Sequence, residues 1–134
     1  MVLYGLKNCD TCRKALKLLG DIEFRDVHHI FLTHHHFDHI GSLFACLGLN
    51  MMTQRRVPLT IYGPPGTQSI VDGLVMACNV PNEIGFGVPG QNLPHPRDFV
   101  KVTEIVPGSE IVIDDLKMTC CENTHYRTED KFGE

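Results

Sequence analysis

Four of the eight histidines of the chain lie within six residues, together with one aspartate. The spacing is H-x-H-x-D-H, in which the named positions are His34, His36, Asp38 and His39, and His35 separates the first two. Neutral imidazole nitrogens and carboxylate oxygens are the ligands that Zn²⁺ and similar divalent ions prefer. The alternative is a solvated loop rich in histidine, but an expression tag would be a uniform run at a terminus. The interrupted, internal spacing therefore predicts a metal site.

The cluster follows a short β-favouring stretch, residues 30–33, and is followed by an isoleucine and a glycine. The carboxyl end of a strand is the edge at which open α/β sheets bind ligands. At such an end, His34 and His36 can turn toward the same side, and Asp38 and His39 come after a short turn. We expect His35, between two ligands, to point away from them.

Strand-like and helix-like stretches alternate along the chain, which predicts an α/β fold. We expect helices at residues 13–20, 41–53 and 66–80, and strands at residues 1–6, 30–33, 57–64, 99–106, 109–114 and 116–124. The first two strands and the helix between them are typical of a parallel pair with a crossover connection. Proline and glycine are frequent between residues 81 and 98, and this stretch is expected to be a long irregular loop.

The composition is that of a globular domain, with a hydrophobic fraction of 43% and a charged fraction of 21%. The net charge is −4, so the chain has no basic field that would attract nucleic acid without sequence preference. No apolar run approaches the roughly 18 residues that a membrane span needs, and the N-terminus does not resemble a signal peptide. We therefore expect a cytoplasmic protein with reduced thiols that binds no membrane, and we expect Cys46 and Cys78 in its core.

The motif and the sequence after it resemble the metallo-β-lactamase superfamily. The stretch IFLTHHHFDHIGSL is similar to that family's T-H-x-H-x-D-H motif followed by I-G. The next stretch, VPLTIYGPPGTQSIVDGL, resembles the branch that contains ribonuclease Z and related phosphodiesterase- and arylsulfatase-like hydrolases. KMTCCENTHY resembles the third motif of that branch, a strand that delivers one more histidine, His125. The resemblance covers residues 21–126.

This resemblance implies a role for each of the motif residues. His34, His36 and His125 would hold a first metal ion, and Asp38 and His39 would face a second. Three imidazoles and a water are a catalytic zinc arrangement, because the open position lets the metal lower the pKa of the water toward ~7. Asp38 would be the catalytic residue that orients the resulting hydroxide or takes its proton. The expected cofactor is Zn, with one ion per chain.

The family fold has two similar halves packed sheet to sheet between helices, and its remaining ligands would come after His125. We therefore expect a partial metallo-β-lactamase-like αββα half-sandwich with an incomplete second metal site. An N-terminal strand and helix of thioredoxin-like type would complete the sheet. The uncovered sheet face predicts a homo-oligomer.

The beginning of the chain resembles another family. MVLYGLKNCDTCRKALKLLG is similar to the opening of the arsenate reductase and Spx-like thioredoxin-fold family, in which Cys9 would be the redox nucleophile and Cys12 the second cysteine. A cysteine at a helix N-terminus has a lowered thiol pKa, which gives this pattern a physical basis. The two resemblances predict a chimera of three segments: a thioredoxin-like segment at 1–20, an incomplete metal-binding region at 21–126 and a polar tail at 127–134.

Three functions are consistent with these patterns. The first is a metal-dependent hydrolase of a small-molecule ester or phosphodiester, inactive if truncation has removed too much of the site. The second is a zinc-binding chimeric or fragment protein without turnover. The third is a thiol oxidoreductase or arsenate-reductase-like protein that uses Cys9.

Overall fold

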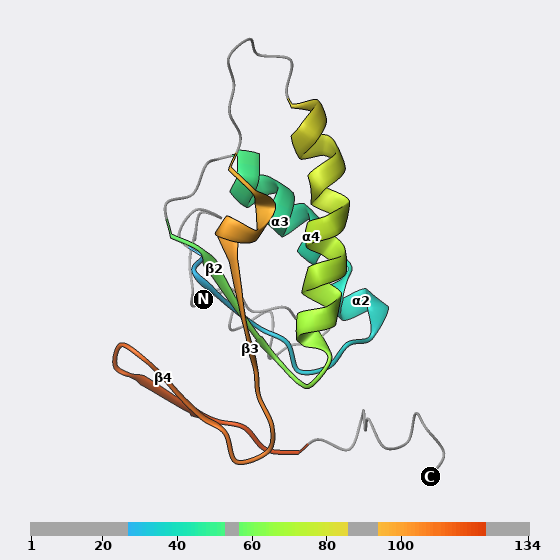
Figure 1. Cartoon of the computed structure of the whole chain (residues 1–134). Coiled ribbons are helices and arrows are strands. Elements are labelled where there is room, and N and C mark those ends of the chain that lie inside the picture. The colour runs from blue at the N-terminus through green and yellow to red at the C-terminus, as the bar shows by residue number, and fades with distance from the viewer. Residues whose placement is uncertain (1–26, 53–56, 86–93, 123–134) are drawn as a thin grey trace.

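The computed structural model describes residues 27–52, 57–85 and 94–122. The predicted strand at 1–6, the predicted helix at 13–20, Cys9, Cys12 and His125 lie outside these ranges. Figure 1 shows the arrangement of the elements. In chain order they are β1 (His29–Phe31), α2 (Phe37–Ile40), α3 (Leu43–Met52), β2 (Leu59–Gly63), α4 (Thr67–Ile84), η2 (Pro96–Phe99), β3 (Val100–Glu104), β4 (Glu110–Ile113) and β5 (Leu116–Thr119).

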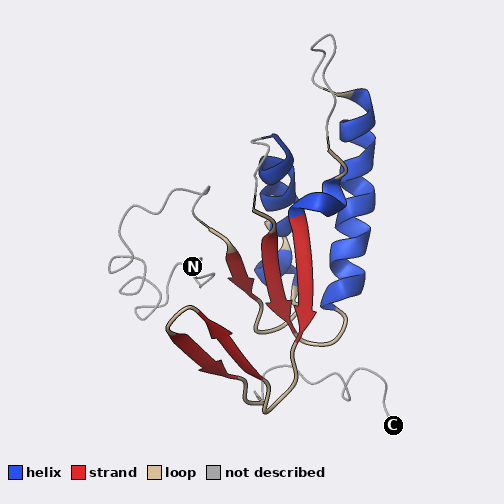
Figure 2. Cartoon of the chain, turned by 60° about the vertical axis from the view of Figure 1, so that its left-hand side comes forward, coloured by secondary structure: helices blue, strands red, loops and turns tan. Residues whose placement is uncertain are grey.

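Three parallel strands form the larger sheet, in the order β1-β2-β3. Ile61 in the central strand is in register with Ile30 on one side and with Val102 on the other. Parallel neighbours need crossover connections, and the helices supply them: α2 and α3 lie between β1 and β2, and α4 and η2 lie between β2 and β3. Figure 2 shows the helices on one side of this sheet, so the predicted α/β class is confirmed.

The hydrophobic core lies between the sheet and the two longer helices. Leu43 and Leu47 are four residues apart on α3, as are Val71 and Val75 on α4, and this spacing places each pair on one face of its helix. The strands contribute the side chains at alternate positions, which are Ile30, Leu59, Ile61 and Val100. The two cysteines expected in the core, Cys46 and Cys78, are buried there, and burial raises the pKa of the Cys78 thiol.

Helix α4 is longer than the sequence predicts. The helix was expected to end at residue 80, before Pro81, but it continues to Ile84 with Pro81 inside its last turn. Gly85 then ends it with φ 69°, and its N–H donates to the Pro81 carbonyl at 3.1 Å. A proline removes one backbone hydrogen bond from a helix. Helix α4 tolerates this loss because the buried face of its earlier turns packs in the core. The loop expected from residue 81 is therefore wrong for residues 81–84, and η2 is a further short helix within the same stretch.

Strands β4 and β5 form a separate antiparallel hairpin. Its turn uses Asp114 with φ 53°, and an ion pair joins Lys117 to Glu110 at 2.8 Å. The strand expected to reach residue 124 ends at Thr119, so Cys120 and Cys121 follow the strand. The backbone of Cys120 nevertheless pairs with Gly108 and Ser109, because its carbonyl accepts at 2.8 Å and its N–H donates at 2.9 Å.

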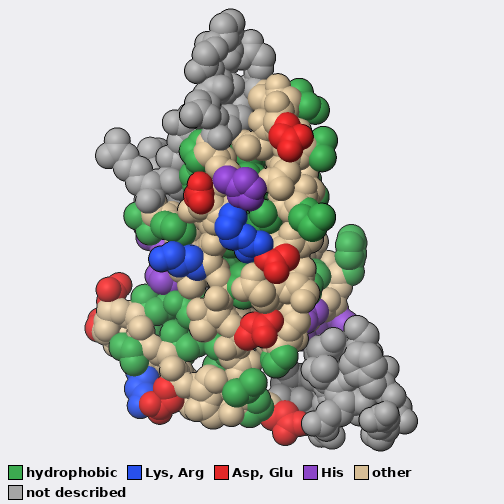
Figure 3. Space-filling model, in the orientation of Figure 1, with side chains coloured by type: hydrophobic (Ala, Val, Ile, Leu, Met, Phe, Trp, Pro, Cys, Tyr) green, Lys and Arg blue, Asp and Glu red, His purple; other side chains and the backbone are tan. Residues whose placement is uncertain are grey.

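The surface of the molecule mixes charged and apolar side chains, as Figure 3 shows for one face. Several large apolar side chains are exposed, including Phe37 at 85% and, on α4, Met76 at 70% and Ile84 at 77%. Within the described ranges, no helix has both the length and the apolar character needed to cross a membrane.

Candidate functional site

His34 is the first histidine of the motif and the most buried of its members. Beyond the end of β1, the Leu32 N–H still donates to the Tyr62 carbonyl at 2.8 Å, which holds the start of the motif loop against β2. The His34 side chain is 6% exposed, and its Nδ1 lies 2.9 Å from the Thr33 hydroxyl. When Nδ1 donates this hydrogen bond, the buried Nε2 is the ring atom that carries the lone pair. This is the tautomer in which an imidazole binds a metal through Nε2.

The short helix α2 and the residue that precedes it bring two further imidazoles to His34. Its turn is closed by the His39 N–H, which donates to the His36 carbonyl at 2.9 Å. The ring centroid of His34 lies 4.6 Å from that of His36, at an interplanar angle of 85°, and 4.3 Å from that of His39, at 51°. His36 is exposed and His39 is half-buried, so the cluster extends from the core to the surface. We call these three residues the histidine cluster.

Asp38 borders the histidine cluster on its solvent side. It lies in the first turn of α2, and its Oδ2 is 3.5 Å from Nε2 of His39. The Asp38 side chain is 70% exposed. A carboxylate in this position can accept a proton from water and exchange it with solvent.

The donor types of the motif fit a divalent metal, but the described residues do not contain a complete set. Across residues 27–52, 57–85 and 94–122, no group of three or more His, Cys, Asp or Glu side chains is arranged to hold a metal ion. The histidine cluster brings its rings together edge-on and tilted, whereas zinc needs nitrogens aimed at one point at about 2.0–2.1 Å. His125, the third ligand that the resemblance implies for the first ion, is outside the described residues.

His35 turns out of the motif loop toward the beginning of α4. Its Nε2 lies 2.8 Å from the hydroxyl of Thr67, and that hydroxyl donates to the Pro64 carbonyl at 2.6 Å. From the sequence, His35 was expected to point away from the other histidines, but no partner was predicted for it. The sequence predicted a strand ending at Pro64 and a helix over residues 66–80, but it held no local signal that His35 would meet Thr67.

Glu104 holds the same turn from the other side. Helix α4 has no capping side chain of its own at Gly66, where φ is 99°. Instead, the Glu104 carboxylate at the end of β3 accepts hydrogen bonds from the N–H groups of Gly66 at 2.8 Å and of Gln68 at 2.9 Å. A carboxylate at a helix N-terminus satisfies free donors and interacts favourably with the helix dipole. Sequence reasoning missed this residue because it comes from a distant strand.

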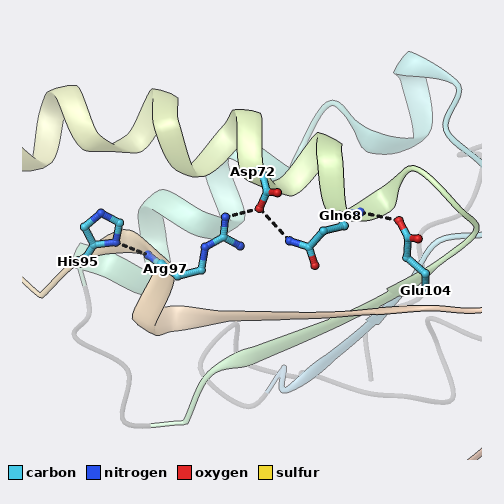
Figure 4. Close-up of polar contacts among 5 residues, drawn as sticks. All are labelled: Gln68, Asp72, His95, Arg97 and Glu104. Atoms are coloured by element: carbon cyan, nitrogen blue, oxygen red, sulfur yellow. Dashed lines mark hydrogen bonds and ion pairs between the residues drawn. The ribbon is translucent and has the colours of Figure 1, made fainter.

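A second polar cluster joins α4 to η2, as Figure 4 shows. Asp72 accepts hydrogen bonds from the side chains of Gln68, at 2.7 Å, and of Arg97. These bonds, first that from Gln68 and then that from Arg97, hold the pKa of the Asp72 carboxyl below its usual value. His95 accepts from the Arg97 N–H at 3.1 Å and begins η2. We call Gln68, Asp72 and Arg97 the α4–η2 cluster.

Comparison with known proteins identifies the class to which this fold and motif belong. Residues 13–133 match the family described as a beta-lactamase superfamily domain. The chain is 32% identical over 114 residues to ribonuclease Z of Geobacillus kaustophilus (strain HTA426), which covers 85% of this chain and 32% of that protein. It is 31% identical over 99 residues to ribonuclease Z of Bacillus thuringiensis (strain Al Hakam), which covers 74% of this chain and 29% of that protein. The chain belongs to the beta-lactamase superfamily.

The family that the motif predicted is thereby confirmed, as is the partial metallo-β-lactamase-like fold. The chain spans about a third of the length of these curated relatives. The family match begins at residue 13, inside the segment 1–20 that was expected to be thioredoxin-like. The three-segment division and the chimera stay predictions, as do the roles of Cys9 and Cys12.

Proposed function

We propose that this chain carries the histidine motif of a metal-dependent hydrolase that cleaves phosphodiester or ester bonds. The observation that carries the proposal is the histidine cluster, in which three imidazoles meet at the carboxyl end of β1. Membership of the beta-lactamase superfamily supports the hydrolase class. The relatives are named ribonucleases, and a ribonuclease cleaves phosphodiesters, so we favour a phosphodiester substrate.

In this proposal His34, His36 and His125 hold one zinc ion, and Asp38 and His39 face a second position. When bound, the ion would supply Lewis acidity and would activate water at neutral pH. The chain's own residues would do the rest. Thr33 orients the His34 ring through Nδ1, and the exposed Asp38 carboxylate accepts a proton from the attacking water. Because His34 is buried and His36 and Asp38 are exposed, the substrate would approach from the side of α2.

A second candidate is a zinc-binding protein without turnover. The described residues do not contain a complete group of three metal-binding side chains, so the motif histidines could bind zinc without completing a catalytic centre. The two candidates share the same ligands and differ only in whether hydrolysis occurs.

The decisive experiment measures zinc content and hydrolysis of bis-p-nitrophenyl phosphate on the same samples, with and without a chelator. Wild type, His34→Ala, His36→Ala and His125→Ala are compared, with His95→Ala as the matched control because His95 lies at the start of η2. The hydrolase proposal expects zinc and turnover in wild type and in the control, and neither in the three motif variants. Zinc without turnover selects the second candidate, and unchanged zinc content in all variants contradicts both.

The homo-oligomer expected from the sequence is also a proposal. The sheet face opposite the helices carries Phe31, which is half-buried, and Tyr62, which is only 9% exposed, since their neighbours Ile30 and Ile61 point into the core. Their rings are stacked, with centroids 4.5 Å apart. Sedimentation of the full chain at micromolar concentration tests the proposal, and a well-folded monomer would exclude it.

A further inference from the structure

The hydrogen bond between His35 and Thr67 joins the motif loop to the turn between β2 and α4. The two residues are 32 positions apart, and the Nε2–Oγ1 distance is 2.8 Å. We call residues 64–67 the β2–α4 turn. His35 lies between His34 and His36 in the sequence, so this bond holds the residue next to both of these members of the histidine cluster.

The direction of this hydrogen bond is set by the number of protons available. The Thr67 hydroxyl has one proton, and it donates that proton to the Pro64 carbonyl at 2.6 Å. The hydroxyl oxygen must therefore accept from His35, so Nε2 of His35 carries a proton. Both the neutral Nε2–H tautomer and the doubly protonated ring meet this requirement, and the bond does not depend on the charge of His35.

Thr67 is a rigid anchor. It is fully buried as the first residue of α4, and a Cβ atom at Gly63 would overlap its hydroxyl, which shows how closely the backbone of β2 approaches it. Gly66 packs beside the His35 ring, where an added Cβ would lie 3.6 Å from Cε1. The Glu104 carboxylate binds the backbone on both sides of Thr67, at Gly66 and Gln68. An imidazole attached at this point is held by the core, the sheet and the helix.

The anchored side chain restrains the backbone of its two neighbours. Residues 34–36 lack regular secondary structure, and the backbone of His36, with φ −59° and ψ 141°, is close to polyproline II. The three side chains make two separate contacts: His35 meets Thr67, and the rings of His34 and His36 meet each other. Fixing His35 at the β2–α4 turn therefore restrains the short segment that carries both of these rings.

We propose that His35 and Thr67 are positioning residues, whose hydrogen bond fixes the motif loop so that His34 and His36 lie beside each other before a metal ion arrives. This role rests on the proposed function, because it has a consequence for chemistry only if these histidines bind a metal. Ordering the ligands in advance means that metal binding does not have to order the loop.

The test compares zinc affinity, measured by competition with a chromophoric chelator, in variants that remove or restore the hydrogen bond. His35→Leu and Thr67→Val remove one partner each with little change in volume. Both are expected to weaken zinc binding about 10-fold, the lower end of the effect of losing a residue that orients ligands. Thr67→Ser keeps the hydroxyl and His35→Gln keeps an N–H donor, so both are expected to bind zinc within about 3-fold of wild type. The double variant His35→Leu/Thr67→Val should be no weaker than either single variant, because both remove the same bond.

His95→Leu is the control for replacing a histidine by leucine. Thr103→Val is the control for removing a threonine hydroxyl, because Thr103 is exposed. Melting temperature is measured for every variant. If the two residues position the loop, zinc affinity falls in His35→Leu and Thr67→Val and stays near the wild-type value in the conservative variants. A variant that melts earlier but binds zinc as wild type does would overturn the positioning role, and so would additive losses in the double variant.

A second measurement uses the metal-free protein. The ring ¹⁵N shifts of His35 should be those of an Nε2–H imidazole and should change in Thr67→Val but not in Thr103→Val. An Nδ1–H tautomer would contradict the bond. Wild type that binds no zinc overturns the proposed function together with the positioning role, whereas wild type that binds zinc equally well with His35→Leu overturns only the positioning role.

Discussion

The histidine cluster and the α4–η2 cluster both gather polar side chains, but they differ in the chemical type of the groups that contact one another. In the α4–η2 cluster, a carboxylate meets a guanidinium and an amide, so opposite charges and matching hydrogen-bond groups satisfy one another. In the histidine cluster, imidazoles contact one another, while the Thr33 hydroxyl lies beside His34 and the Asp38 carboxylate lies beside His39. Gathering like bases brings no mutual charge attraction, and a cation is the partner that such an arrangement suits.

Burial separates the two regions further. Asp72 and Arg97 keep 47% and 40% of their side chains exposed, whereas His34 is 6% exposed. An exposed ion pair contributes little to stability because water competes with each partner. A buried imidazole among other imidazoles is a less common arrangement and favours a functional explanation. The α4–η2 cluster is therefore a structural tie, and the histidine cluster is the candidate site.

The largest expected effect is on zinc binding. His34→Ala should reduce zinc affinity by at least about 100-fold, more than the loss of an orienting residue, because it removes a proposed ligand. Asp72→Ala should leave zinc affinity unchanged, since its contacts lie on α4 and η2. If the two substitutions reduce zinc affinity equally, the histidine cluster is not distinguished from the α4–η2 cluster as a metal site.

The next effect concerns the close packing behind Thr67. Gly63→Ala should destabilise the fold by about 1–3 kcal/mol, because the new methyl group overlaps the Thr67 hydroxyl and crowds Leu32. Gly73→Ala is the control: Gly73 lies in α4 with open space around it, and alanine there should raise stability by up to about 1 kcal/mol. Urea denaturation measures both. If Gly63→Ala is neutral, Thr67 is not a rigid anchor.

A pH effect is expected at the edge of the sheet. Burial, and secondarily the neighbouring His28, lower the pKa of His29 below its usual 6.5, and Asp114 partly opposes this. The unfolded chain therefore binds the proton more tightly, so His29 makes the fold less stable as pH falls from about 6.5 through the lower folded pKa. Thermal unfolding between pH 8 and pH 5 should lose less stability in His29→Gln than in wild type. If His29→Gln and wild type lose the same stability over this pH range, His29 does not contribute to the pH dependence of folding.

The smallest effect is expected from the α4–η2 cluster. Because the folded pKa of Asp72 is lowered, its contribution to stability is present above the unfolded value of 3.8 and is lost as pH falls through the folded pKa. Asp72→Asn should therefore lower the melting temperature slightly at neutral pH and should match wild type in strong acid. A large loss at neutral pH would show that this cluster is more than an exposed tie.

The local elements near the motif were predictable because their signals are local. The stretch at residues 57–64, ended by Pro64 and Pro65, predicts β2, and the helix-like stretches at residues 41–53 and 66–80 predict α3 and α4. The end of α4 was not predictable in this way. A proline is read as a helix stop from its own chemistry, whereas the packing of Val71, Val75 and Cys78 on the sheet kept the helix intact beyond it.

Within the candidate site, the histidine cluster was predictable and its support was not. The spacing of His34, His36 and His39 in one short stretch indicates metal chemistry by itself, because ligand type and separation are properties of the chain. The contacts of His35 with Thr67 and of Glu104 with Gly66 join residues more than 30 positions apart. No local pattern marks such pairs.

The sequence by itself determined the family, through the resemblance of its motif stretches, and it determined the α/β class and the residue types offered to a metal, through composition and short-range spacing. The tertiary structure alone decided that β1, β2 and β3 lie side by side, so that the ends of β1 and β3 both reach the β2–α4 turn. The physical reason is that parallel pairing aligns the carboxyl ends of distant strands at one edge. At that edge His35 contacts Thr67, and Glu104 binds the N–H groups of Gly66 and Gln68 on either side of it.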